Sequence, residues 1–161
     1  MTKGQIISTG KRLEYARGYT ALGLFREAGS ELEQIAVHDQ GSIEVQSVWV
    51  DLYLAAQKWK DVLKIARLVC ETAPEKEGAW IAWAQALRKM DSIKEAECVL
   101  LKAEPFHGAK SAVLHYHLAC YACLQGDHIE ADRRVSKACK LDESYSEKSL
   151  NEPDLRGMMP F

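Results

Sequence analysis

Two histidines and two cysteines lie close together in the segment HYHLACYAC, residues 115–123. Imidazole nitrogens and thiolates are common zinc ligands, and a Cys-x-x-Cys pair can also carry out redox chemistry. On a helix, His117, Cys120 and Cys123 fall on one stripe, about one turn apart from one another. The segment is therefore a candidate metal or thiol site, with these three residues as its ligands.

The surroundings of this segment favour a structural role instead. No second pair of cysteines or histidines follows at a spacing that would complete a tetrahedral zinc site. The Cys-x-x-Cys pair lies inside a helical pattern, whereas redox pairs usually open a helix beside a βαβ unit. Thiols also behave as small hydrophobic side chains that suit tight helix packing. We therefore predict no metal and no cofactor here.

Motifs of common enzyme classes are missing from the sequence. It contains no G-x-S-x-G, no glycine-rich loop for phosphate and no H-E-x-x-H. Its paired carboxylates have the setting of solvated surface charges. The sequence therefore predicts a protein that is not an enzyme.

Composition and charge narrow the class of protein. Of the 161 residues, 47% are hydrophobic and 27% are charged, which is typical of a globular domain. A formal charge of −2 does not favour binding to nucleic acid, and no apolar run is long enough for a membrane span. The start has no apolar signal sequence, and the odd number of cysteines, 5, indicates reduced thiols. We expect a cytoplasmic protein with no nucleic-acid or membrane partner.

The elements that position these residues are predicted to be helices. Long segments carry apolar residues at three- and four-residue spacing, and no strand-like alternation or hairpin turn is present. None of the 4 prolines falls inside these periodic segments. The pattern predicts an all-α protein.

One pattern recurs four times along the chain. A small or branched residue directly follows an acidic residue at spacings of 34, 34 and 35 residues, at Ala28, Val62, Ala96 and Ala131. A large apolar residue precedes each by 13 positions, namely Tyr15, Trp49, Trp83 and Leu118. Such units are pairs of antiparallel helices that close their cores by stacking on neighbours. We expect the large first-helix position to contribute most to stability.

The repeat resembles the tetratricopeptide repeat family, whose unit is a helix pair of 34 residues. The last unit carries the family's Leu118-Ala119 pair, its Gly126-Asp127 turn and Ala131. The resemblance implies a small, stand-alone bacterial-type protein folded as a right-handed α-solenoid. Its parts are an N-terminal extension (1–8), four units (9–42, 43–76, 77–110 and 112–145) and a C-terminal cap or tail (146–161).

The resemblance also implies a function. In this family the first helices line a concave groove that binds a peptide or protein segment. The corresponding positions here are Leu13, Arg17, Thr20, Ser47, Asp51, Leu54, Ile81, Gln85, Arg88, Tyr116, Cys120 and Cys123. We expect a non-catalytic adaptor or scaffold with a protein or peptide partner. Two alternatives stay open: a chaperone for a secreted client, and a thiol or zinc protein that uses the segment described above.

The C-terminal segment differs from the repeat. Its apolar residues, interrupted by proline and glycine, are Leu150, Leu155, Met158, Met159 and Phe161. A solenoid needs a cap over its last helix, so we expect this segment to lie over the fourth unit. A tail that binds a partner or mediates self-association is the alternative.

Overall fold

The computed structural model describes residues 6–158, and within them the chain is helical without any strand. The all-α prediction is confirmed. The elements are α1 (Thr9–Ala21), α2 (Phe25–Glu33), α3 (Val37–Gln40), α4 (Ile43–Ala55), α5 (Trp59–Thr72), α6 (Glu77–Lys89), α7 (Ile93–His107), α8 (Ala112–Leu124), α9 (His128–Leu141), α10 (Ser144–Asn151) and the 3₁₀ helix η1 (Pro153–Met158). Most of the predicted N-terminal extension, and Met159 and Phe161 of the tail, lie outside the described residues.

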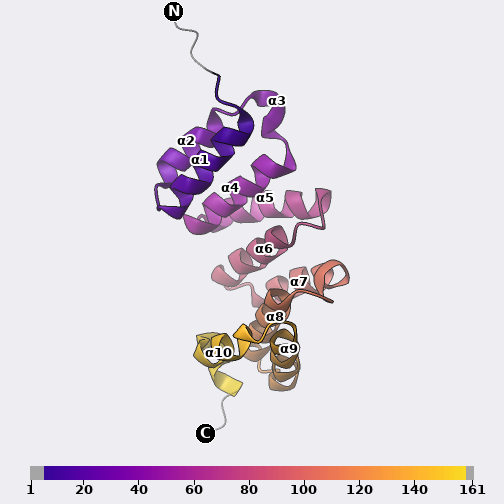
Figure 1. Ribbon diagram of the computed structural model, residues 1–161. Helices are drawn as coiled ribbons and strands as arrows, with labels where there is room; N and C mark the ends of the chain where they lie inside the picture. Colours follow the sequence, from indigo (N-terminus) through magenta and orange to yellow (C-terminus); the bar gives the residue numbers. More distant parts are fainter. Residues whose placement is uncertain (1–5, 159–161) are drawn as a thin grey trace, which may run out of the picture.

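The helices form hairpins that follow one another along an elongated stack (Figure 1). The hairpins are α1–α2, α4–α5, α6–α7 and α8–α9, and each contacts the next. The short helix α3 connects the first two hairpins and was not expected from the sequence. No helix in residues 6–158 has the length and apolar character needed to cross a membrane.

The first helices of three hairpins begin at a serine cap. The hydroxyl of Ser8 accepts a hydrogen bond from the Lys11 amide, and Ser42 and Ser111 do the same for the amides three residues later. Such a cap pairs one of the backbone N–H groups that a helix start leaves without a partner. In the third hairpin the position is Lys76, whose side chain makes no such bond.

All four hairpin turns share one hydrogen-bond pattern. In each, an amide donates to the carbonyl five residues earlier, as from Leu24 to Tyr19 (2.8 Å) and from Lys58 to Tyr53 (2.9 Å). This bond closes the end of the first helix and requires a left-handed residue just before the donor. That position is occupied by Gly23 (φ 75°), Gln57 (φ 56°), Asp91 (φ 60°) and Gly126 (φ 85°). The middle two hairpins thus keep the turn geometry without glycine.

The recurring small position is buried throughout the stack. Ala28, Val62, Ala96 and Ala131 are all 0% exposed. The large first-helix position is less uniform, because Tyr15 is 41% exposed while its neighbour Ala16 is fully buried. Tyr15 therefore lacks the full burial on which the expectation of a large stability contribution rests. The core there combines the small residues Ala16 and Ala28 with larger aliphatic side chains such as Leu13 and Leu32.

The buried side chains form two separate clusters. The smaller one joins α1, α2 and α4, and includes Leu13, Leu32 and Val48. The larger one extends from α4 to η1 and includes Val50 and Leu155. Helix α4 contributes to both, since Val48 and Val50 point to different clusters.

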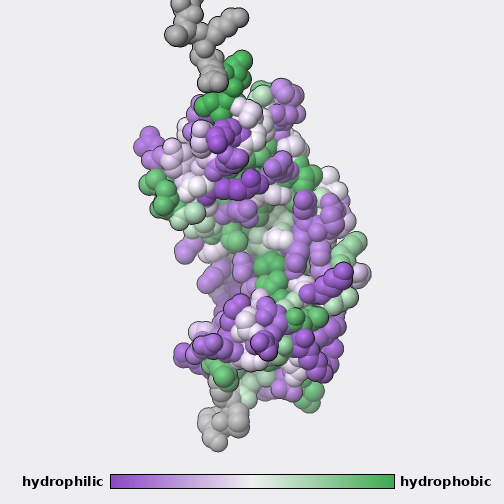
Figure 2. All heavy atoms as spheres, viewed as in Figure 1, coloured by the Kyte–Doolittle hydropathy of each residue, from purple (hydrophilic) through white to green (hydrophobic). Residues whose placement is uncertain are grey.

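The position of one proline differs from the sequence-based expectation. Pro105 lies within α7, two residues before its last residue, although the prolines were expected outside helices. Proline has no N–H to bond the carbonyl four residues earlier, and α7 ends two residues after it. The surface in view is mostly hydrophilic, with hydrophobic side chains in small separate areas (Figure 2).

Candidate interaction face on the first helices

Two pockets open on the face formed by α1, α4, α6 and α8, which we call the first-helix face. The N-terminal pocket, of about 520 Å³, is lined by Arg17, Glu44, Ser47, Val50, Asp51, Glu75, Lys76, Glu77, Gly78 and Ala79. The tail pocket, of about 470 Å³, is lined by Leu54, Trp59, Gln85, Arg88, Lys89, Tyr116, His117, Cys120, Tyr121, Glu152, Pro153 and Asp154. Asp51 and Leu54 are one turn apart on α4, so the two pockets adjoin along this helix.

Charges of both signs line the N-terminal pocket. Arg17 lies 3.8 Å from Glu44, and both side chains are more than half exposed. Asp51 is partly enclosed, and burial raises the pKa of its carboxyl, while Arg17 acts in the opposite direction. The Ser47 hydroxyl is engaged by the Ile43 carbonyl at 2.7 Å. Arg17 and Asp51, on the first helices of adjacent hairpins, are among the charged groups that this pocket offers a ligand.

The tail pocket combines aromatic, amide and cationic groups. The Gln85 amide lies 3.4 Å from Nε2 of His117, which requires that nitrogen to accept and the imidazole to be neutral. Burial lowers the pKa of His117 to about 4, in agreement with a neutral ring. The cationic group is Arg88 on α6, and Lys89 lies beside it.

The C-terminal segment forms one wall of the tail pocket. The Arg88 guanidinium donates to Asp154 Oδ1 at 3.0 Å and to Oδ2 at 3.3 Å. The Tyr116 hydroxyl donates to Glu152 Oε2 at 2.6 Å. Leu155 is only 3% exposed and joins the larger buried cluster. The segment therefore covers the last hairpin and also contacts the first-helix face.

Most of the predicted groove residues lie at these pockets, and four do not. Leu13 is 0% exposed and belongs to the smaller buried cluster, so it faces the core. Thr20 hydrogen-bonds its own helix at the Ala16 carbonyl. Ile81 packs against the larger cluster, and Cys123 is 7% exposed beneath the 3₁₀ helix. Trp59, Tyr121 and the acidic tail residues were not among the predicted groove positions. Trp59 and Tyr121 line the pocket from α5 and α8, and only the path of the tail brings Glu152 and Asp154 to it.

Comparison with known proteins identifies the architecture. No family model and no curated protein sequence matches this chain. Among solved structures, the MamA protein has a TM-score of 0.75 at 14% identity, over 91% of this chain and 78% of that chain. TTC0263 of Thermus thermophilus, described as a thermophilic TPR protein, has a TM-score of 0.72 at 17% identity, over 92% and 85%. YrrB, described as a TPR protein with an unusual peptide-binding site, has a TM-score of 0.66 at 11% identity, over 92% and 81%.

This chain has the tetratricopeptide-repeat (TPR) fold. The predicted fold is confirmed by these matches together with the all-helical stack. Since the identities are low, the likeness concerns the backbone arrangement of the repeats and not the residues on their faces.

In the TPR stack, the residues of the candidate metal segment point in different directions. His115 is 0% exposed and faces α7 and α9, whereas His117 and Cys120 face the tail pocket. Cys123 lies under η1, where a Cβ added to Gly157 would be 3.6 Å from its sulfur. Within residues 6–158, no three His, Cys, Asp or Glu side chains come together in a way that could hold a metal ion.

The thiols of this segment are in an environment opposite to that of a reactive cysteine. All 5 cysteines are free. Burial raises the pKa of Cys120 and of Cys123, and it raises that of Cys70 to about 12. Nucleophilic and metal-binding cysteines require the thiolate, which a raised pKa disfavours. The segment packs as part of the last TPR unit.

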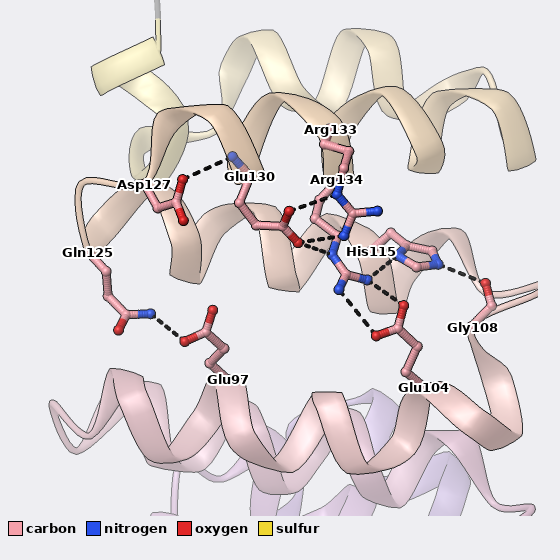
Figure 3. A network of polar contacts seen from close by, with 9 residues as sticks. All are labelled: Glu97, Glu104, Gly108, His115, Gln125, Asp127, Glu130, Arg133 and Arg134. Carbon is pink, nitrogen blue, oxygen red and sulfur yellow. Dashed lines mark hydrogen bonds and ion pairs between the residues drawn. The ribbon is translucent and has the colours of Figure 1, made fainter.

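His115 is part of a polar network that joins the last three helices of the repeat (Figure 3). Its Nε2 lies 2.7 Å from the Gly108 carbonyl and its Nδ1 lies 2.9 Å from Nη1 of Arg134. A carbonyl only accepts and a guanidinium only donates, so the ring is neutral with its proton on Nε2. Burial lowers the pKa of His115, which also favours this form.

Arg134 is the centre of the network, with a side chain only 6% exposed. It donates to Glu104 on α7 at 2.7 Å and to Glu130 on its own helix at 2.6 Å. The hydrogen bond from Arg134 lowers the pKa of Glu104, and bonds from Arg133 and Arg134 lower that of Glu130 to about 2. The network therefore ties the fourth hairpin to the third through a buried charge that makes 4 hydrogen bonds.

Proposed function

We propose that this chain is a non-catalytic protein-interaction module that binds a protein or peptide segment along the first-helix face. The observation that carries the proposal is the pair of adjoining pockets on this face, which together involve all four hairpins. Both have polar groups beside apolar walls, as binding sites for protein segments generally do.

The rigidity of the walls supports the same proposal. The pockets are built on helices that pack into buried clusters, so little ordering is needed when a ligand enters. Arg17 and Asp51 supply charge at one end, and Arg88 supplies it at the other. An extended segment running along α4 contacts both pockets without any rearrangement of the stack.

Site-specific photo-crosslinking tests this proposal. A photoreactive amino acid is introduced at Ser47 or Gln85 on the first-helix face, and at Leu68 or Leu101 as controls. Leu68 and Leu101 are 52% and 44% exposed and lie on the second helices α5 and α7. We expect crosslinks to a partner at least about fivefold more often at the first-helix positions. Equal or preferential crosslinking at the two leucines would contradict the proposal.

A further inference from the structure

The C-terminal segment is hydrogen-bonded to the first-helix face in the way that a bound peptide would be. Its residues Glu152 and Asp154, two positions apart, are held by groups from two different repeat units. The Arg88 guanidinium on α6 uses two of its N–H groups on Asp154, at 3.0 and 3.3 Å. Tyr116 on α8 donates to Glu152 at 2.6 Å. Paired N–H donation of this kind is a strong and directional way to recognise a carboxylate.

The contact leaves the pocket only partly filled. About 470 Å³ remains between the segment and α4, α6 and α8, with Trp59 and Lys89 on its walls. The two acidic residues therefore cover one side of a larger site. A longer or bulkier segment with the same two carboxylates has room to make further contacts there.

One buried hydroxyl in this pocket lacks a partner. Tyr121 is 1% exposed and lines the pocket, and within the described part of the chain its hydroxyl makes no hydrogen bond. A buried polar group without a partner destabilises the fold, because its lost hydrogen bonds to water are not replaced. A ligand group that reaches this hydroxyl recovers that free energy, which the chain's own segment does not.

We propose that the tail pocket binds an acidic extended segment of a partner protein that carries two carboxylates two residues apart. This rests on the proposed function of the first-helix face. In the free protein, Glu152 and Asp154 occupy the carboxylate positions, and the partner displaces them. Arg88 and Tyr116 are the recognising groups, and Tyr121 donates to the partner.

Competition between the tail and a partner for the same pocket has a measurable consequence. A tethered segment competes at a high effective concentration, so the apparent affinity for a partner equals the intrinsic affinity multiplied by the fraction of molecules in which the site is open. Neutralising the tail weakens this competition and leaves the buried anchor Leu155 in place. Partner affinity then rises, although no residue of the pocket itself has changed.

The test uses the full chain and a labelled synthetic peptide with the sequence of residues 149–158, SLNEPDLRGM. Binding is measured by fluorescence anisotropy for the wild type and for the double variant Glu152→Gln, Asp154→Asn. We expect the double variant to bind the peptide at least about tenfold more tightly than the wild type. Adding Arg88→Gln to the double variant removes most of that gain. Circular dichroism and thermal melting confirm that each variant keeps its fold.

Two controls make the result decisive. A peptide with glutamine and asparagine in place of its two acids binds the double variant at least about tenfold more weakly. The proposal is overturned by equal binding of both peptides, by equal binding to wild type and double variant, or by binding that Arg88→Gln leaves unchanged. Light scattering tests the remaining possible occupant of the pocket, which is the tail of a second copy of this chain. A dimer that dissociates in the Arg88→Gln variant would identify that tail as the occupant in place of a partner protein.

The outcome is separable from the proposed function. Crosslinks at Ser47 and Gln85 without acidic-peptide binding leave the interaction face in place and reject this ligand chemistry. Absence of crosslinks at both positions rejects the face itself.

Discussion

Nδ1 of His115 on α8 accepts a hydrogen bond from Arg134 on α9 at 2.9 Å, in the interior of the last hairpin. The pair connects an imidazole that the fold keeps neutral to a guanidinium that is always charged. Both side chains are almost completely buried, and Glu104 supplies the counter-charge from α7. The relationship explains why one histidine of the candidate metal segment is structural.

Replacing Arg134 tests this network. Arg134→Ala leaves Glu104 without its partner and His115 with an unpaired nitrogen, so we expect a loss of about 3 kcal/mol in the free energy of unfolding. Arg133→Ala is the matched control, because Arg133 also bonds Glu130 but is 56% exposed. Its loss should stay below about 0.5 kcal/mol. Urea denaturation measures both, and equal losses would show that burial of Arg134 has no special weight.

Acid should destabilise the fold through His115 and His117. The folded-state pKa of His115 is lowered, and that of His117 is lowered to about 4. Below pH 6.5 the unfolded chain therefore binds protons that the folded chain does not, and stability falls as pH decreases. For His117 the loss accumulates between about pH 6.5 and pH 4, by at most about 1.4 kcal/mol per pH unit.

Thermal melting at pH 7.5, 6, 5 and 4 checks this pH dependence. His117→Gln should flatten the decline, whereas replacement of the exposed His38 on α3 serves as the control. A melting temperature that stays constant from pH 7.5 down to pH 4 would refute the prediction.

The left-handed turn positions should favour glycine in every hairpin. Gln57→Gly and Asp91→Gly remove a left-handed strain and should each stabilise the protein by about 0.5–1 kcal/mol. Gly126→Ala, at φ 85°, should be destabilising by about 1 kcal/mol, although no atom would clash with the added Cβ. Gly18→Ala is the control, since Gly18 lies inside α1 and alanine favours a helix there. Chemical denaturation distinguishes these cases by sign.

Alkylation should separate the cysteines by exposure. Cys98 is exposed, whereas Cys70, Cys120 and Cys123 are buried. Since burial also raises the pKa of these three thiols, we expect iodoacetamide at pH 8 to modify Cys98 first, and the buried group at least about tenfold more slowly. Peptide mass mapping over time measures this. Rapid modification of Cys120 in folded protein would reopen the thiol interpretation.

Periodicity was sufficient to predict the fold but only part of the face. Ala28, Val62, Ala96 and Ala131 recur because each must fit between backbones, and such a constraint is visible in a single sequence. Leu13 was placed on the face because the resemblance assigned its helix position there, and the structure instead buries it among α2 and α4 side chains. Positions that face the core and positions that face the groove lie within one turn of the same helix. Packing between hairpins determines which of the two a given residue faces.

The tail could not be predicted in the same way. Glu152 and Asp154 meet Tyr116 and Arg88 across 36 and 66 residues of sequence. No periodic pattern links these positions, because the contact depends on the path of the chain after α9. The sequence suggested a cap for this segment, and the buried Leu155 agrees with that role, but charge pairing with the face becomes visible only in three dimensions.

The division of α4 between two buried clusters has a consequence for how the molecule loses its structure. Val48 packs in the cluster of the first hairpin, and Val50 packs in the cluster that continues to the C-terminal end. In a linear array each unit is stabilised by its neighbours only. The smaller cluster is connected to the rest of the stack through α4 alone. We therefore expect partial unfolding to begin there, with α1 and α2 separating together while the remaining hairpins stay folded.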